Sequence, residues 1–166
     1  MRGGSLAATG GPLFYSTNTT GVINLKNAML SCKSGVLLKA GADQWGNTGS
    51  NGSDITFNAD TQKLKGDVVL DNISTVKIAL KNSSISEGAI NAAKTAKSVS
   101  LSLDKSSRWD VSADSYLTGL TDADAALSNI NGNGHTVYYD STGSANSWLG
   151  GRTISLAGGG QLAPAK

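Results

Sequence analysis

The sequence predicts an all-β protein folded as a right-handed single-stranded parallel β-helix, and three observations lead to this prediction. Gly, Ser, Thr and Asn fill 70 of the 166 positions, and 11 Asp stand against a single Glu, a composition that favours turns and strand ends over helix. Short apolar runs alternate with polar residues at a period of two. These runs also form rows that repeat about every 20 residues, the spacing expected of stacked solenoid coils.

The length and the charge limit the possible classes of protein. A chain of 166 residues suits one domain, and its 16% charged and 5% aromatic residues argue against a coiled coil or a nucleic-acid binder. The net charge of +2 is spread thinly along the chain, so we expect no nucleic-acid partner. No apolar run approaches the ~20 residues of a membrane span.

The elements follow one another as short strands separated by turns. Residues 1–12 are expected to form a flexible leader, residues 13–157 the β-helix domain, and residues 158–166 a flexible tail. Residues 41–54 exceed the length of a turn and predict a loop that projects from the solenoid, and residues 89–97 support at most a short helical turn. The clearest strand patterns lie at residues 55–57, 68–70, 76–80, 99–103, 109–111, 137–139 and 154–156.

The long period separates a solenoid from an antiparallel sandwich, which has no reason to share it. We expect roughly seven coils of three strands each, at about 20 residues per coil. Neither end shows a strong amphipathic cap, which favours a piece of a longer rod that is monomeric or makes end-to-end contact through exposed coils. The predicted rows are Val36, Ile55, Val76, Val99 and Leu120, then Val68, Ile90, Val111 and Ile130, and finally Leu117, Val137 and Leu156.

The most distinctive stretch covers residues 99–122, VSLSLDKSSRWDVSADSYLTGLTD. Together with residues 129–140, 144–151 and 158–162, it resembles the coil pattern of bacterial adhesin-like and autotransporter-passenger β-helices. The resemblance implies a secreted or surface-displayed protein whose signal peptide and anchor are not in this chain. It implies a non-enzymatic structural rod that presents loops for contact, with a host or cell-surface glycan or protein as the partner.

The alternative is a carbohydrate-active β-helix, acting as a glycan-binding module or as part of a polysaccharide lyase or hydrolase. Such an enzyme would need carboxylates or basic residues gathered in a groove along one sheet. The candidates are Asp67 with Asp71, and Asp104 and Asp110 with Lys105 and Arg108. Their positions at strand ends and in a turn favour ordinary exposed charge, so we expect no catalytic residues.

The sequence predicts no metal site and no cofactor. One His and one Cys cannot build a zinc site, and neither Asp110 with Asp114 nor Asp122 with Asp124 fits a calcium-loop spacing, although calcium at these pairs stays an alternative. Cys32 is expected to be a small buried side chain, and His135 a turn residue before a strand.

The one candidate for a residue that contacts a ligand is aromatic. Trp45, in the projecting loop, is the candidate ligand-binding residue, with packing against the solenoid wall as the alternative. We expect Trp109 in the core and Trp148 to pack on the last coil. Tyr116, Tyr138 and Tyr139 lie in strand patterns whose alternation turns some of them outward. Ice or mineral binding is disfavoured because the Thr residues do not recur at the coil period.

Overall fold

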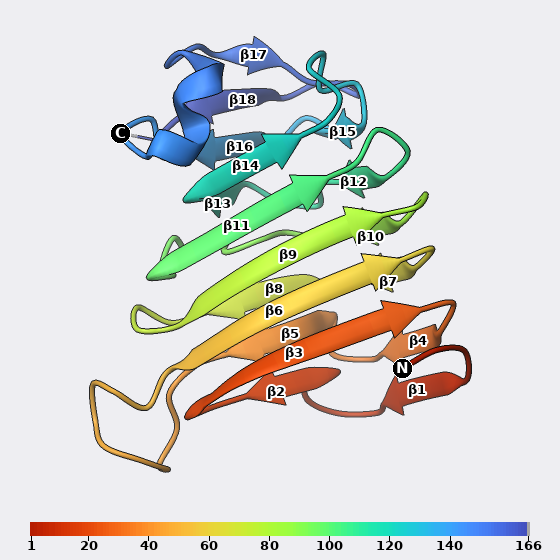
Figure 1. The fold of residues 1–166 in the computed structure, drawn as a ribbon, viewed down its shortest axis with the longest axis vertical. Coiled ribbons are helices and arrows are strands. Elements are labelled where there is room, and N and C mark those ends of the chain that lie inside the picture. Colours follow the sequence, from red (N-terminus) through yellow and green to blue (C-terminus); the bar gives the residue numbers. More distant parts are fainter. Residues whose placement is uncertain (166) are drawn as a thin grey trace.

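Successive short strands wind around one axis, and each pairs in parallel with the strand one coil away (Figure 1). The computed structural model describes residues 1–165. It is an all-β parallel solenoid of about seven turns, with equivalent residues about 23 apart. The strands nearest the viewer rise as they run from left to right, so the solenoid is right-handed (Figure 1). The predicted fold class is confirmed.

The largest sheet, here called the broad sheet, supplies one wall of the solenoid. Its register places Phe57, Ile78, Leu101 and Leu120 in one inward row, because each pairs with the next across adjacent coils. The side chains of the alternate positions face solvent, as the period of two requires. The strands are β3 (Thr19–Lys26), β6 (Ser53–Asp60), β9 (Thr75–Lys81), β11 (Ser98–Leu103) and β14 (Gly119–Asp122).

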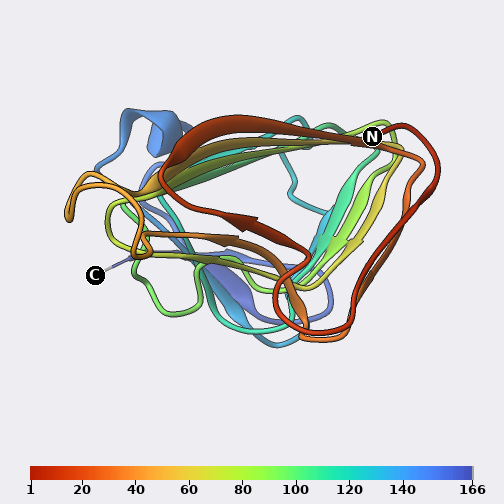
Figure 2. The same cartoon turned by 90° about the horizontal axis from the view of Figure 1, so that it is seen from below.

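Two further walls, together with the broad sheet, enclose the core of the solenoid. Figure 2 shows this arrangement in a view along the solenoid axis. The second wall contains β1 (Ser5–Ala8), β4 (Met29–Cys32), β7 (Lys63–Lys65), β10 (Ile85–Glu87), β12 (Arg108–Asp110) and β15 (Ile130–Asn131). The third wall contains β2 (Phe14–Ser16), β5 (Val36–Ala40), β8 (Asp67–Leu70), β13 (Ser115–Leu117), β16 (Thr136–Tyr139) and β18 (Gln161–Pro164). Ile90 joins the two sheets of the third wall: it bridges to Val68, and its carbonyl accepts from the amide of Tyr116.

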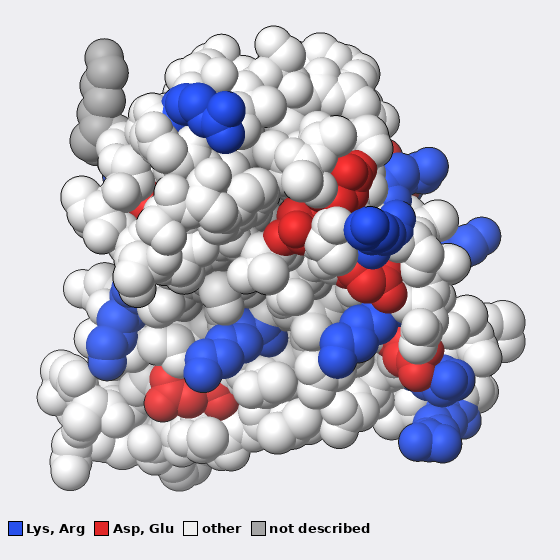
Figure 3. All heavy atoms as spheres, turned by 45° about the horizontal axis from the view of Figure 1, so that its top comes forward, with Lys and Arg blue, Asp and Glu red and all other residues white. Residues whose placement is uncertain are grey.

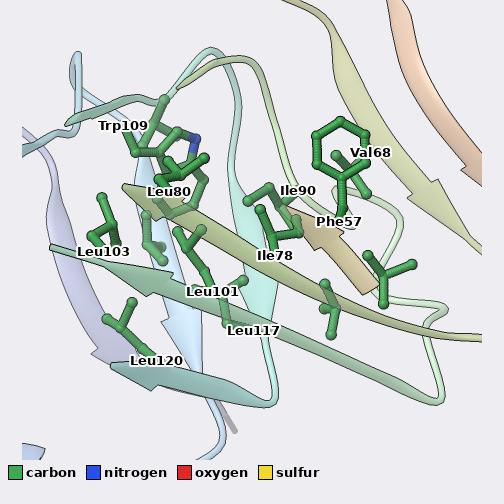
Figure 4. Packing of buried hydrophobic residues seen from close by; sticks show 14 of the residues in the cluster. Phe57, Val68, Ile78, Leu80, Ile90, Leu101, Leu103, Trp109, Leu117 and Leu120 are labelled. Atoms are coloured by element: carbon green, nitrogen blue, oxygen red, sulfur yellow. The ribbon is translucent and has the colours of Figure 1, made fainter. Parts of the chain in front are cut away.

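The core runs along the axis, where inward residues of the three walls meet (Figure 4). Phe57, Ile78 and Leu101 of the broad sheet face Val68 and Ile90 of the third wall (Figure 4). Trp109 is fully buried and donates its indole N–H to the carbonyl of Gly88 at 2.9 Å, so the expectation that Trp109 lies in the core is confirmed. A buried indole without an acceptor would cost stability, which makes this bond part of the packing.

Buried polar side chains hold the corner between the broad sheet and the second wall. The backbone N–H of Gln62 donates to the Ser84 hydroxyl at 3.1 Å, and the backbone N–H of Ser84 donates to the Ser107 hydroxyl at 3.2 Å. The Gln62 side chain bonds both backbone groups of Ala28, accepting from its N–H at 2.9 Å and donating to its carbonyl at 2.8 Å. Each corner amide therefore finds a side-chain acceptor one coil further along, which satisfies backbone groups that no strand pairs.

The C-terminal end of the solenoid is covered. The 3₁₀ helix η1 (Ser144–Leu149) contacts β14, and Asn146 accepts from the amide of Leu120 at 2.8 Å. Leu149 is fully buried, whereas Trp148 is 39% exposed and donates to the Leu120 carbonyl. The strand β17 (Ile154–Ser155) then pairs antiparallel with β18. This corrects the expectation of a missing cap at the C-terminal end. Trp148 contacts the last strand of the broad sheet, as expected, and the neighbouring Leu149 is the residue buried in that end.

Both ends of the described chain belong to the solenoid. β1 pairs in parallel with β4 from Ser5 to Ala8, within the 1–12 segment for which a flexible leader was expected. β18 pairs with β16 from Gln161 to Pro164, within the expected flexible tail at 158–166. The Gly-rich composition of these segments was a poor guide because hydrogen bonds to a neighbouring coil do not depend on side chains.

The register corrects several of the predicted rows. Ile55, Val76 and Val99 do share a row, as do Val68 and Ile90. Val36 instead lies on the third wall in β5, Leu120 pairs with Leu101, and Leu117 pairs with Tyr139. Ile130 pairs with Trp109. When the pairing register between two strands shifts by two residues, the same side chains still face inward. The alternation of apolar and polar residues alone therefore cannot detect such errors.

Residues 41–52 make an excursion between β5 and β6 (Figure 1, lower left), whereas residues 53 and 54, which the sequence assigned to the loop, belong to β6. Residues 91–97 form a turn without a helix. Across residues 1–165, no helix has the length and apolar character that a membrane crossing requires.

Candidate functional site

The carboxylates proposed for catalysis do not converge. Asp67 and Asp71 stand at opposite ends of β8, as expected of strand-end residues. Asp67 accepts from the Ala89 amide at 2.8 Å, and Asp71 accepts from the Ala42 amide at 2.6 Å. Burial alone would raise the pKa of Asp71, but hydrogen bonds from Ala42, Ile73 and Ser74 hold it below its usual value. Both carboxylates therefore brace backbone turns.

The second set of charged candidates lies elsewhere, around β12. Asp104 accepts from the amide of Asn82 at 2.7 Å and from the amide of Ser107 at 2.8 Å, and these bonds lower its pKa against the opposing effect of burial. Arg108 and Asp110 form an ion pair at 2.9 Å on the outside of the second wall. On the face in Figure 3, basic and acidic side chains are interspersed rather than gathered by sign.

The Asp pairs considered for calcium also bond to the protein. Asp124 accepts from the Ser128 hydroxyl, and this bond is the main reason that the pKa of Asp124 is lowered. Asp114 accepts from the amide of Thr136 at 2.8 Å. In the part of the chain that the structure describes, no three His, Cys, Asp or Glu side chains gather in a way that could hold a metal ion.

Cys32 is partly exposed, which corrects the expectation of a buried thiol. It lies in β4 beside a shallow hollow of about 430 Å³ that Lys65 and Glu87 also line. A hydrogen bond with the Ser34 hydroxyl, at 3.1 Å, lowers the pKa of Cys32. His135 lies in the turn before β16, as expected, with its Nδ1 3.8 Å from a carboxylate oxygen of Asp114.

Trp45 stands out from the solenoid in the projecting loop. Its side chain is 66% exposed, so it does not pack against the wall, and the candidate ligand-binding residue is available to a partner. Asn51 is buried at the base of the loop and donates to the carbonyls of Asp43 and Trp45 at 2.6 and 3.0 Å. The exposed Trp45 side chain is thus carried by backbone that Asn51 holds in place.

Tyr15 of β2 fixes the same loop from the third wall. Its hydroxyl donates to the Asp43 carboxylate at 2.5 Å, and this bond raises the pKa of Tyr15 and lowers that of Asp43. Lys39 of β5 holds its ammonium 5.3 Å from the centre of the Tyr15 ring. The loop therefore stands beside an outward Tyr and Lys on the third wall.

Further along the third wall, two outward tyrosines form a stacked pair that the sequence did not reveal. The rings of Tyr116 and Tyr138 lie 4.7 Å apart between centroids and 11° from parallel. They stack because β13 and β16 pair in parallel with these two residues opposite each other. Their spacing of 22 residues, close to one coil, was the signal that could have identified the pair. Tyr139, the neighbour of Tyr138, is buried and donates to the carbonyl of Arg152.

The third wall therefore offers two places for contact: the loop with Trp45 at one end and the stacked tyrosines nearer the other. Aromatic faces of this kind bind apolar or planar groups without any chemical step. No protein family matches this chain, and comparison with curated proteins and with solved structures finds no significant similarity.

Proposed function

We propose that the protein is a non-enzymatic, secreted or surface-displayed bacterial β-helix that acts as an adhesin-like rod and presents its projecting loop for contact. The observation that carries the proposal is Trp45, a large aromatic side chain left 66% exposed in a projecting loop whose backbone Asn51 anchors. Exposed aromatics that are held in place are typical of contact sites, because they bury much surface at little cost in conformational entropy.

The charged groups support a structural rather than a chemical role. The carboxylates of Asp67, Asp71 and Asp104 each accept a backbone amide from another coil or loop. A carboxylate engaged in this way is poorly placed to move a proton to or from a substrate.

Adhesion can be tested with fluorescent beads that carry the purified protein. Binding of the beads to bacterial cells and to cultured epithelial cells would be counted by flow cytometry. We expect binding that Trp45→Ala reduces several-fold and that Val22→Ala leaves unchanged, because Val22 is equally exposed, at 63%, but lies on the broad sheet. Equal binding of both variants and the unaltered protein would refute a role for the loop.

The second candidate function is glycan recognition, and the stacked pair Tyr116 and Tyr138 specifically favours it. Sugar rings have apolar faces that pack against aromatic rings. This candidate retains the rod but assigns the contact surface to the third wall.

A further inference from the structure

The stacked tyrosines belong to a row of outward positions that stops short of the last strand. In register, Tyr116 of β13 pairs with Tyr138 of β16, and Tyr138 pairs with Ala163 of β18. The row therefore contains two rings in succession and then a methyl group. No third ring continues the stack.

A hollow of about 520 Å³ lies along this row and reaches the position of Ala163. Tyr116, Tyr138 and Pro164 give it apolar lining, and Lys94, Thr153 and Gln161 give it polar lining. Thr153 and Gln161 are both exposed, so their polar groups are accessible at the rim. A volume between about 300 and 1,000 Å³ with a few polar groups around apolar surface is usual for small-ligand sites.

We propose that this hollow binds a pyranose ring of a glycan, with one face of the sugar stacked on the aromatic pair at Tyr138. The inference rests on glycan recognition, the second function proposed above, and specifies its site. The pairing of an aromatic floor with a polar rim suits a sugar, whose ring faces are apolar and whose hydroxyl groups project from the ring edge. The Thr153 hydroxyl and the Gln161 amide supply donors and acceptors for those hydroxyl groups.

The site is also pre-formed. Tyr138 is held by strand pairing on both sides, to β13 and to β18, and its ring is held by the stack with Tyr116. A ligand that stacks on it orders little that is not already ordered, which favours measurable affinity at a small site. The ammonium of Lys94 lies 5.4 Å from the centre of the Tyr116 ring, so positive charge borders the same hollow.

The test uses immobilised hexasaccharides of cellulose, chitin, xylan, polygalacturonate and alginate as probes. We expect the unaltered protein to be retained on at least one, with saturation transfer from protein to sugar ring protons in NMR. Tyr138→Ala should weaken retention about tenfold, the magnitude expected for loss of one aromatic contact. Tyr138→Phe keeps the ring and should bind normally.

A second variant separates loss of binding from loss of folding. Thr153→Tyr adds a ring at an exposed position beside the hollow, so it should block binding without lowering the melting temperature. Retention that neither Tyr138→Ala nor Thr153→Tyr weakens would overturn the site while leaving glycan recognition standing, and loss on Trp45→Ala alone would move the contact to the loop. Failure of every probe to retain the unaltered protein would overturn both.

Discussion

Asp122 occupies in β14 the register position that Leu103 occupies in β11, so a carboxyl group ends an inward row that contains Ala59, Leu80 and Leu103. Burial raises the pKa of Asp122. Its Oδ1 accepts from Asn129 at 3.0 Å and from the amide of Asp124 at 2.8 Å. Its Oδ2 and the Asn129 side-chain oxygen are both buried without a hydrogen-bond partner.

Replacing Asp122 by Asn should stabilise the protein at pH 7. The substitution removes a charge that burial disfavours and supplies an N–H donor near the unpaired oxygen of Asn129. We expect a gain on the order of 1 kcal/mol, or roughly 2–4 °C in melting temperature for a chain of this size. A lower melting temperature for Asp122→Asn at pH 7 would contradict this description of the corner.

The same carboxyl predicts how stability changes with pH. Because the pKa of Asp122 is higher in the folded protein than its ordinary value of 3.8, the folded state binds more protons between the two values. Its contribution to stability is therefore full below pH 3.8 and is lost as the pH rises through the folded pKa. Urea unfolding at successive pH values should show this fall in the unaltered protein and not in Asp122→Asn.

Asp60 should act in the opposite direction. Hydrogen bonds from Lys26, Asn82 and Thr61, with Lys26 contributing most, lower its pKa from 3.8 to about 2. Its contribution is present above pH 3.8 and is lost as the pH falls through about 2. NMR titration of the side-chain carboxyl should give the low value, and Lys26→Met should move it back toward 3.8. An unchanged titration in Lys26→Met would refute the role of this ion pair.

Gly88 should tolerate no side chain. At its φ of +155°, a Cβ would lie 2.2 Å from the carbonyl oxygen of Gly66 in the adjacent coil. The Gly66 oxygen belongs to the backbone and cannot turn aside as a flexible side chain could, so Gly88→Ala should force two coils apart and cost at least ~2 kcal/mol. Gly10→Ala is the matched control, because a Cβ there meets nothing within 4 Å. Chemical denaturation of the two variants measures the contrast, and equal stability would refute the close approach.

Gln62 should be essential for the stability of the corner between the broad sheet and the second wall. Gln62→Leu would leave the N–H and the carbonyl of Ala28 without their partners in a buried corner. We expect a loss of about 2–3 kcal/mol in unfolding free energy. Gln44→Leu, in the exposed part of the projecting loop, should change stability by less than about 0.5 kcal/mol. Comparable losses in both variants would mean that the corner bonds do not matter.

The sequence predicted the solenoid because its inward Val, Leu and Ile residues show two repeats at once. They alternate with polar residues along each strand, and the strands themselves recur once per coil. The sequence placed Trp109 in the core for the same reason, since that residue alternates in phase with Val111. The register of neighbouring coils could not be predicted, because coils of unequal length allow shifts by two that keep every apolar side chain inward. The three spacings after Phe57 in the broad sheet, to Ile78, Leu101 and Leu120, are all different.

The candidate site was only half predictable. Trp45 could be identified because a loop longer than a turn needs leaves its aromatic residue free of the coil pattern. The 22-residue spacing of Tyr116 and Tyr138 suggested that the two could be neighbours, but whether their rings stack depends on the register of β13 and β16, which the spacing alone does not fix. Asp122 was considered only as a calcium candidate with Asp124, and its place in an inward row was missed for a related reason: only the register places this carboxylate in line with leucines.

We propose that this solenoid binds through its surface and performs no chemistry on what it binds. The most direct measurement incubates the protein with a panel of soluble polysaccharides and follows both retention of the protein and new reducing or unsaturated ends. We predict retention on at least one polysaccharide with no new ends after prolonged incubation. Product that forms in proportion to protein concentration and persists through repurification would contradict the claim.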